Sequence, residues 1–223
     1  SRSNYPNTGL SLASSLNMDY LPENLGKDSI PLIESIEKNR AVSFLQSIGY
    51  LYIHLSDDAA GTNKNGEADI VITNRKYISF FSQYLLNKTI LKNMNFHSLD
   101  AIQIKRNNIL HGFKKLKEIP KNDEPTFTFA HFLMPHGPQA FDKSGDIPIQ
   151  SASEPGKYFG EVLYANKKIR QLVEYILANS DIPPIIIIQG DHGYSFTVSN
   201  RPNVDEVKKR YSNLNAYYLP EQG

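Results

Sequence analysis

Apolar residues recur along the chain with two different spacings, and each spacing predicts one type of element. Unbroken β-branched runs and apolar–polar alternation are typical of strands, whereas apolar residues every three or four positions are typical of amphipathic helices. The first pattern predicts strands over residues 50–55, 126–133, 184–189 and 214–219. The second pattern predicts helices over residues 31–48, 77–86, 99–116 and 157–179.

The order of these elements indicates the fold class. Strands that alternate with helices are typical of α/β domains built on a mostly parallel sheet. The run at 184–189 is apolar almost throughout, as expected of a strand that is buried on both faces. We therefore predict a three-layer α/β sandwich in which residues 50–55, 126–133 and 184–189 share one central sheet. The long Pro/Gly-rich loop at 134–156 lies between two of these strands, and loops of such length in compact domains are commonly functional.

Composition and charge limit the classes of protein to consider. The chain has 223 residues, of which 40% are hydrophobic and 21% are charged, and this suits one globular domain with a sizeable core. The formal net charge of +1 argues against a broad basic surface for nucleic acid. The absence of cysteine excludes disulfides, thiolate zinc sites and a cysteine nucleophile. No apolar run approaches the roughly 20 residues that a membrane-spanning helix needs, so we expect any membrane or targeting segment to lie outside this stretch.

Two motifs with histidine come directly after predicted strands. Asp191 and His192 stand between two glycines at the end of the isoleucine-rich strand, and His136 follows the strand at 126–133. Ligands of open α/β sheets bind at the carboxyl ends of the strands, so we expect these side chains to lie at one edge of the sheet. Asp and neutral His are good ligands for zinc-like metals. The alternatives are an ordinary turn at Asp191 and a solvent-exposed loop histidine at His136.

A third cluster lies near the start of the chain, in the sequence NYPNTGLSLASSLN at residues 4–17. Thr8 and Ser11 are three residues apart and would share a face if a helix begins here. The free N–H groups and the dipole at a helix N-terminus favour an anion such as phosphate. Thr8 is therefore a candidate nucleophile, which a metal would activate, and Ser11 is a candidate substrate contact. The alternative is that Thr8 only caps the helix.

Two further histidines lie within predicted strands. Alternation along the strand places His131 in the core, and we favour a structural role in which the backbone satisfies its ring. His54 is followed closely by Asp57 and Asp58, a group that could reach the edge of the sheet. A polar loop is the simpler interpretation of that group.

The motifs Thr8-Gly9-Leu10-Ser11-Leu12, PHGP at 135–138 and GDHG at 190–193, taken in this order, resemble the sulfatase-like branch of the alkaline phosphatase superfamily. Within that branch, the chain resembles membrane-anchored enzymes of the lipoteichoic acid synthase and phosphoethanolamine transferase type, and the likeness extends over most of its length. The resemblance implies an alkaline phosphatase-like fold and one divalent metal, Zn²⁺ or Mn²⁺.

The same resemblance assigns roles to individual residues. It implies that Thr8 is the metal-bound nucleophile, that Asp191 and His192 are metal ligands, and that His136 contacts the phosphate-bearing substrate. True sulfatases carry Cys or Ser in a C/S-x-P-x-R motif, which this chain lacks. The resemblance therefore favours phosphoester or phosphodiester chemistry over sulfate esters.

The chain also departs from the family pattern at both ends. In the family, a strand before the nucleophile carries an acidic metal ligand, and the pattern continues beyond the last strand predicted here. We therefore expect residues 1–223 to be a fragment of a single sulfatase-like domain, with the fourth ligand lying before Ser1. We expect such a fragment to bind metal weakly and to be inactive on its own.

The resemblance implies a metal-dependent hydrolase or transferase that acts on phosphoesters or phosphodiesters at the bacterial cell envelope. The expected partner is a lipid or glycan phosphate ester and not a nucleic acid, and the expected location is the extracytoplasmic side of a membrane protein. One alternative is a non-catalytic domain of the same fold that binds an envelope glycan or a lipid head group. Another is a cytosolic metal-dependent mutase of the same superfamily.

Overall fold

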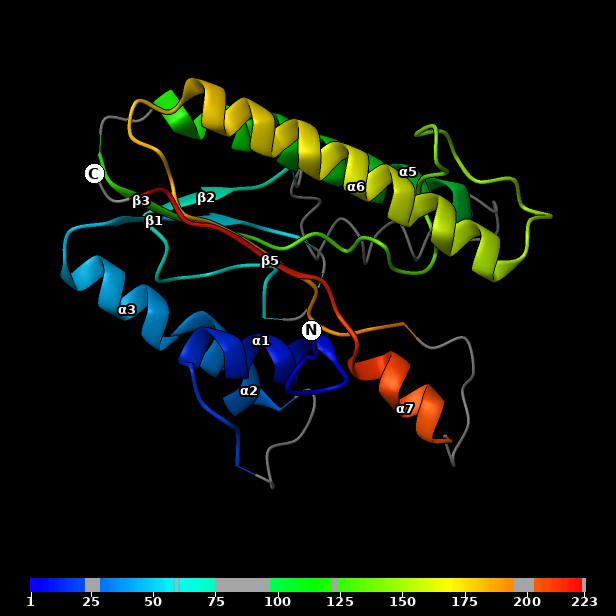
Figure 1. The fold of residues 1–223 in the computed structure, drawn as a ribbon, viewed down its shortest axis with the longest axis horizontal. Coiled ribbons are helices and arrows are strands. Elements are labelled where there is room, and N and C mark those ends of the chain that lie inside the picture. Colours follow the sequence, from blue (N-terminus) through cyan, green and yellow to red (C-terminus); the bar gives the residue numbers. More distant parts are fainter. Residues whose placement is uncertain are drawn as a thin grey trace, which may run out of the picture.

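The computed structural model describes residues 1–22, 29–57, 59, 61–74, 97–121, 124–194 and 203–221. The helices are α1 (Thr8–Asn17), α2 (Ile30–Glu37), α3 (Arg40–Ser47), α5 (His97–Leu116), α6 (Glu154–Asn179) and α7 (Val204–Tyr211), with a 3-10 helix at Ile119–Lys121. The strands are β1 (Leu51–Leu55), β2 (Ile70–Ile72), β3 (Thr126–Ala130), β4 (Ile186–Gln189) and β5 (Asn215–Tyr218). Strands and helices alternate as predicted (Figure 1).

Three parallel strands form the main sheet, in the order β2-β1-β3. β1 is the middle strand, where Ile53 pairs with Ile70 on one side and with Thr128 on the other. Because the strands are parallel, the chain leaves β1 and β3 at the same edge of the sheet. The loops that follow these two strands are therefore neighbours, and the prediction that residues 50–55 and 126–133 share one sheet is confirmed.

Helices cover both faces of this sheet. α5 and α6 lie above the strands in Figure 1, and α1, α2 and α3 lie below them. The main core packs the upper helices on the sheet and includes Leu55, Ile109, Phe113, Phe141 and Leu172. A smaller core packs α1 on α2. The predicted three-layer α/β class is thus confirmed.

None of the described helices combines the length and the apolar character needed to cross a membrane.

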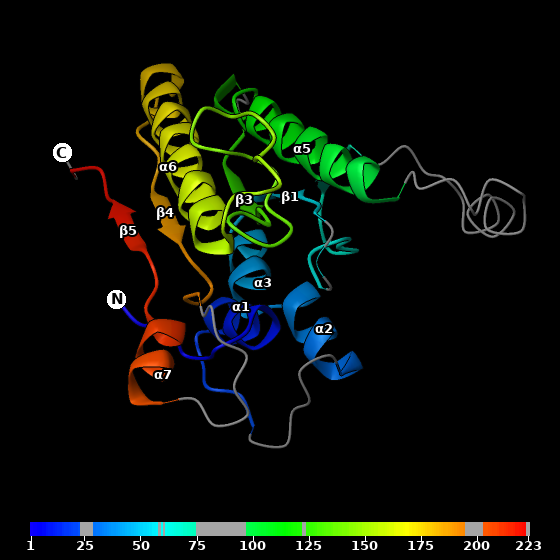
Figure 2. The same ribbon diagram turned by 90° about the vertical axis from the view of Figure 1, so that its right-hand side faces the viewer.

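The isoleucine-rich strand pairs differently from our prediction. β4 pairs with β5 in an antiparallel ribbon, with Ile187 opposite Tyr217, and no ladder of hydrogen bonds joins it to β3 among the described residues. In the view of Figure 2, β4 lies between β5 and β3. Ile185 and Ile187 are 67% and 59% exposed. The prediction of one sheet through residues 184–189 is therefore wrong, because an apolar run indicates a tendency to be buried but does not identify the neighbouring strand.

The region predicted as one helix over residues 31–48 forms two. α2 ends at Glu37, and the side chain of Asn39 then accepts a hydrogen bond from the Val42 amide at 2.9 Å, which caps α3. An asparagine at this position caps a new helix, which favours a break over one continuous helix. The helix predicted at 77–86 lies outside the described residues. β2 and α7 are elements that the apolar pattern did not predict.

Candidate active site

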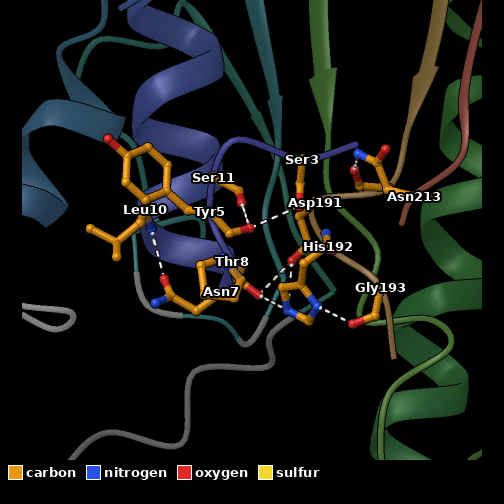
Figure 3. A network of polar contacts seen from close by, with 12 residues as sticks. Ser3, Tyr5, Asn7, Thr8, Leu10, Ser11, Asp191, His192, Gly193 and Asn213 are labelled. Atoms are coloured by element: carbon orange, nitrogen blue, oxygen red, sulfur yellow. Dashed lines mark hydrogen bonds and ion pairs between the residues drawn. The ribbon is translucent and has the colours of Figure 1, made fainter. Parts of the chain in front are cut away.

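Thr8 is the first residue of α1, but it does not cap the helix. The preceding residue, Asn7, takes that role, and its side chain accepts a hydrogen bond from the Leu10 amide at 3.0 Å. The Thr8 hydroxyl instead donates to Oδ2 of Asp191 at 2.5 Å, across 183 residues of sequence (Figure 3). The capping alternative for Thr8 is therefore wrong, and its hydroxyl faces the carboxylate that follows β4.

The Nε2 atom of His192 faces the same hydroxyl and carboxylate. The Nδ1 of His192 lies 2.9 Å from the Gly193 carbonyl, which can only accept, so in the neutral imidazole Nδ1 carries the proton and Nε2 holds the lone pair (Figure 3). Nε2 lies 3.4 Å from the Thr8 hydroxyl oxygen and 3.4 Å from Oδ2 of Asp191. The side chains of Asp191 and His192 are 22% and 15% exposed, so both are mostly shielded from solvent.

These three side chains fit a divalent metal as a partial set of ligands. Oδ2 of Asp191 and Nε2 of His192 are two acceptors that face each other across 3.4 Å, an arrangement that favours a cation. A carboxylate oxygen, a neutral imidazole nitrogen and a hydroxyl oxygen are all suitable donors for zinc-like ions. Within the described part of the chain, no group of three or more His, Cys, Asp or Glu side chains could hold a metal. The hydroxyl of Thr8 is therefore needed to bring the donors to three.

Gly193 of the GDHG turn allows close packing against α7 and the segment after it. A Cβ atom at Gly193 would lie 1.9 Å from the Lys209 carbonyl and 2.3 Å from that of Ser212, so no side chain fits there. The Gly190 amide donates to the Leu214 carbonyl at 2.9 Å. The turn that carries Asp191 and His192 is thus held directly by the backbone that leaves α7.

His136 lies at the same site as the other predicted residues. A cavity of about 350 Å³ is lined by Thr8, His136 and His192, together with Tyr194 and Arg210. The imidazole of His136 is exposed, and its Nδ1 donates to the Gly137 carbonyl at 2.7 Å. Three motifs that lie far apart in the sequence are therefore brought together around one cavity.

Ser11 does not belong to this cavity, and the predicted substrate contact is wrong. Its side chain is 2% exposed, and its hydroxyl donates to the Tyr5 carbonyl at 2.7 Å. Ser14, three residues further along α1, is buried on the same side of the helix. Ser11 therefore lies on the inward face of α1, where it stabilises the turn before the helix.

A buried ion pair supports the loop of His136, and sequence reasoning missed it. Glu161 of α6 is fully buried, and its carboxylate accepts hydrogen bonds from the amides of Ala140 at 2.8 Å and His136 at 3.2 Å. Lys105 of α5 donates to the carbonyls of His136 at 2.5 Å and Pro138 at 3.1 Å, and its Nζ lies 3.9 Å from Glu161.

Burial shifts the pKa of both members of this pair. Desolvation raises the pKa of Glu161, although Lys105 and the backbone amides oppose this shift. Desolvation likewise lowers the pKa of Lys105, and Glu161 opposes it. A signal for Glu161 was present in the sequence, because it shares the buried stripe of α6 with Tyr164, Ala165 and Leu172. A carboxylate at such a position needs a partner.

His131 is paired with a side chain and not with the backbone, contrary to our expectation. Its Nδ1 makes a short contact with Oδ2 of Asp57, and Thr62 donates to the other oxygen of that carboxylate at 2.7 Å. Burial alone would lower the pKa of His131, but the hydrogen bond and charge of Asp57, and the charge of Asp191, raise it above its ordinary value. His54 is buried between the Tyr52 hydroxyl and the Thr62 carbonyl, so its role is structural.

Comparison with known families gave one match that spans all of these residues. A family model described as Sulfatase matches residues 3–220, a range that includes every motif discussed above. Neither the curated proteins nor the solved structures gave a significant match.

Proposed function

Since the chain belongs to the sulfatase family, in the alkaline phosphatase-like superfamily, we propose that it hydrolyses or transfers phosphate esters with Thr8 as the nucleophile. The family indicates an enzyme that acts on sulfate or phosphate esters. One observation carries the finer assignment: the Thr8 hydroxyl is hydrogen-bonded to Asp191 at a cavity that His136 also lines.

The choice of phosphate over sulfate rests on the nucleophile. The chain has no cysteine and no serine in the C/S-x-P-x-R motif that true sulfatases carry. An unmodified threonine hydroxyl is chemically sufficient to attack phosphorus once a base accepts its proton. Thr8 has such a base in Asp191.

In the proposed reaction, the Oγ1–P bond forms while the P–O bond to the leaving alcohol breaks. Asp191 accepts the proton of Thr8, towards which its Oδ2 already points. When protonated, His136 carries an Nε2–H that donates to a non-bridging oxygen or to the leaving oxygen. Water or a second alcohol then attacks phosphorus and gives its proton to His136, while the Oγ1–P bond breaks and Asp191 returns its proton to Oγ1 of Thr8.

Thr8, Asp191 and His192 are the residues that would hold the divalent metal of the family, Zn²⁺ or Mn²⁺. When bound, such an ion neutralises developing negative charge and lowers the pKa of a coordinated hydroxyl. The tautomer of His192, set by the Gly193 carbonyl, leaves Nε2 ready to coordinate.

The proposed setting is the bacterial cell envelope, on the extracytoplasmic side, with membrane attachment through segments outside residues 1–223. The support is the resemblance to lipoteichoic acid synthases and phosphoethanolamine transferases. By the same resemblance, the proposed substrate is a lipid or glycan that carries a phosphate ester.

The test uses the full-length protein and compares three chromogenic substrates: p-nitrophenyl phosphate, bis(p-nitrophenyl) phosphate and p-nitrophenyl sulfate. Each is assayed with Mn²⁺, with Zn²⁺ and with a chelator, and the protein is then digested and searched for phosphorylated Thr8 by mass spectrometry. We expect metal-dependent release from a phosphate substrate and a phosphate group on Thr8. Release from the sulfate substrate alone would contradict the choice of phosphate. No release from any substrate would favour a non-catalytic domain that binds a glycan or lipid head group.

A further inference from the structure

Three segments that are far apart in the sequence meet behind the cavity. They are the N-terminal residues 1–6, the GDHG turn and the residues that end α7. The Ser3 amide donates to the Tyr211 carbonyl at 2.8 Å, and the Gly193 amide donates to the Arg210 carbonyl at 2.7 Å. The Asn213 side chain donates to the Gly190 carbonyl at 2.6 Å. The end of α7 therefore joins the segment of Thr8 to the segment of Asp191 and His192.

The guanidinium of Arg210 lies between these two segments. Its Nε donates to the Pro6 carbonyl at 2.7 Å, and its Nη1 donates to the Gly193 carbonyl at 3.1 Å. Pro6 stands two residues before Thr8, and Gly193 follows His192 directly. The same side chain lines the cavity that Thr8 and His192 share.

No carboxylate among the described residues neutralises the positive charge of Arg210. Across the described ranges, every ion pair of an Arg, Lys or His side chain involves a residue other than Arg210. The two carbonyls use two of its five N–H donors, which leaves three. A guanidinium stays protonated at every physiological pH, and its planar fork matches the paired oxygens of a tetrahedral oxyanion.

We propose that Arg210 binds the non-bridging oxygens of the ester that Thr8 attacks. The inference rests on the proposed function, because it assigns a substrate contact to the same cavity. The two backbone carbonyls fix the guanidinium in place, so little side-chain entropy is lost when the anion binds. Because the two carbonyls belong to the segments of Thr8 and His192, Arg210 would affect both anion binding and the spacing between Thr8 and His192.

The variants to compare are Arg210→Gln, which removes the charge, and Arg210→Lys, which keeps the charge and loses the fork. Lys209→Gln is the matched control, because it removes a neighbouring charge on the exposed side of α7. The first readout is the affinity for inorganic phosphate, measured by calorimetry in the presence of a chelator. The second is turnover of bis(p-nitrophenyl) phosphate with metal, separated into kcat and KM.

We expect Arg210→Gln to weaken phosphate binding by about tenfold or more, Arg210→Lys to weaken it less, and Lys209→Gln to change it less than about twofold. KM should rise along the same series. Unchanged phosphate affinity in Arg210→Gln would overturn the proposal, even if kcat fell, because Arg210 would then only hold the two segments together. Phosphate binding that depends on Arg210 in a protein without turnover would support the anion site and contradict the proposed function.

A measurement on the unmutated protein covers the case in which both variants fail to fold. Phenylglyoxal modifies arginine side chains, and the sites are mapped by mass spectrometry. Inorganic phosphate should slow the modification of Arg210 and leave that of Arg170, an exposed arginine of α6, unchanged. Equal rates at Arg210 with and without phosphate would overturn the proposal.

Discussion

Two clusters in this molecule contain the same three residue types with almost the same spacing. In one, Thr8 donates to Asp191 at 2.5 Å and lies 3.4 Å from a nitrogen of His192. In the other, Thr62 donates to Asp57 at 2.7 Å and lies 3.4 Å from a nitrogen of His131. Residue types and spacing alone therefore do not distinguish a reactive cluster from a structural one.

The two clusters differ in where the histidine proton goes. His131 directs its Nδ1 at the carboxylate of Asp57, which closes the group on itself. His192 uses its Nδ1–H on the Gly193 carbonyl, so its Nε2 and the carboxylate of Asp191 face each other as two acceptors. The cluster of Thr62, Asp57 and His131 is satisfied internally. The cluster of Thr8, Asp191 and His192 offers two acceptors to a cation.

The clusters also differ in their access to solvent. Thr62 is fully buried, whereas Thr8 lines a cavity of about 350 Å³. A hydroxyl can act as a nucleophile only if a substrate can reach it. The comparison predicts that the cluster of Thr8 carries activity and that the cluster of Thr62 carries stability.

The largest effect is expected from removing the two hydroxyls in turn. Thr8→Ala should lower turnover of a phosphate ester on the order of 10³-fold or more, because the nucleophile is lost, while Thr8→Ser should keep part of it. Thr62→Ala should retain turnover and lower the free energy of unfolding by about 1 to 3 kcal/mol, because a buried carboxylate loses a donor. Steady-state kinetics and urea unfolding separate the two. Wild-type rates from Thr8→Ala would make Thr8 a structural residue.

The next effect concerns the ion pair of the buried cluster. Asp57→Asn should lower the free energy of unfolding by roughly 3 kcal/mol, since it leaves His131 without its charged partner. Asp181→Asn, at an exposed position, is the matched control and should change stability little. Urea denaturation of both variants provides the measurement. Equal stability of the two would show that the pair with His131 contributes nothing to the fold.

A smaller effect is expected from the support of the His136 loop. Glu161→Gln exchanges a carboxylate that accepts from two backbone amides for a neutral amide, so the loop of His136 should shift. We expect kcat to fall roughly tenfold, as is usual when a supporting contact of a site is lost. Glu174→Gln on the exposed side of the same helix should leave kcat unchanged. A loss of thermal stability with normal kcat would assign Glu161 to the fold alone.

The smallest effect is a pH dependence that belongs to the buried cluster. Because the folded state raises the pKa of His131, its contribution to stability is fully present below the unfolded pKa, near 6.5, and is lost as pH rises through the folded value. The free energy of unfolding should therefore fall with rising pH more steeply in the wild type than in Asp57→Asn. Parallel pH profiles of the two proteins would exclude this role for the Asp57–His131 pair.

Much of the fold and of the candidate site could be predicted from the sequence, because local patterns determine both. The periodicity of α5 and α6 and the alternation of β1 and β3 place His136 after one strand, and the Asp191–His192 pair follows another. α7 was also predictable in principle, since Asn203 and Glu206 form a capping box at its start. We overlooked that signal because the apolar pattern there is weak.

The remaining features depend on contacts between distant segments, which a single sequence does not encode locally. The pairing of β4 with β5 could not be predicted from its isoleucines, and the inward face of Ser11 could not be read from helical spacing alone. Arg210 and Lys105 stand in ordinary charged helical sequence. Their importance arises only because carbonyls from distant segments accept their hydrogen bonds.

The junction at the end of α7 also determines when the site can exist during folding. Thr8 and Asp191 are 183 residues apart, and the contact between Ser1 and Asn213 spans 212. Contacts with such long sequence separation carry a high loop-closure entropy and form late, after the local helices and the β1–β3 pairing. Local opening of the contacts between residues 1–6 and the end of α7 would separate Thr8 from Asp191, while the core between α5, α6 and the sheet persists. We therefore expect the proposed activity to depend on these long-range contacts and to be lost before the bulk of the secondary structure.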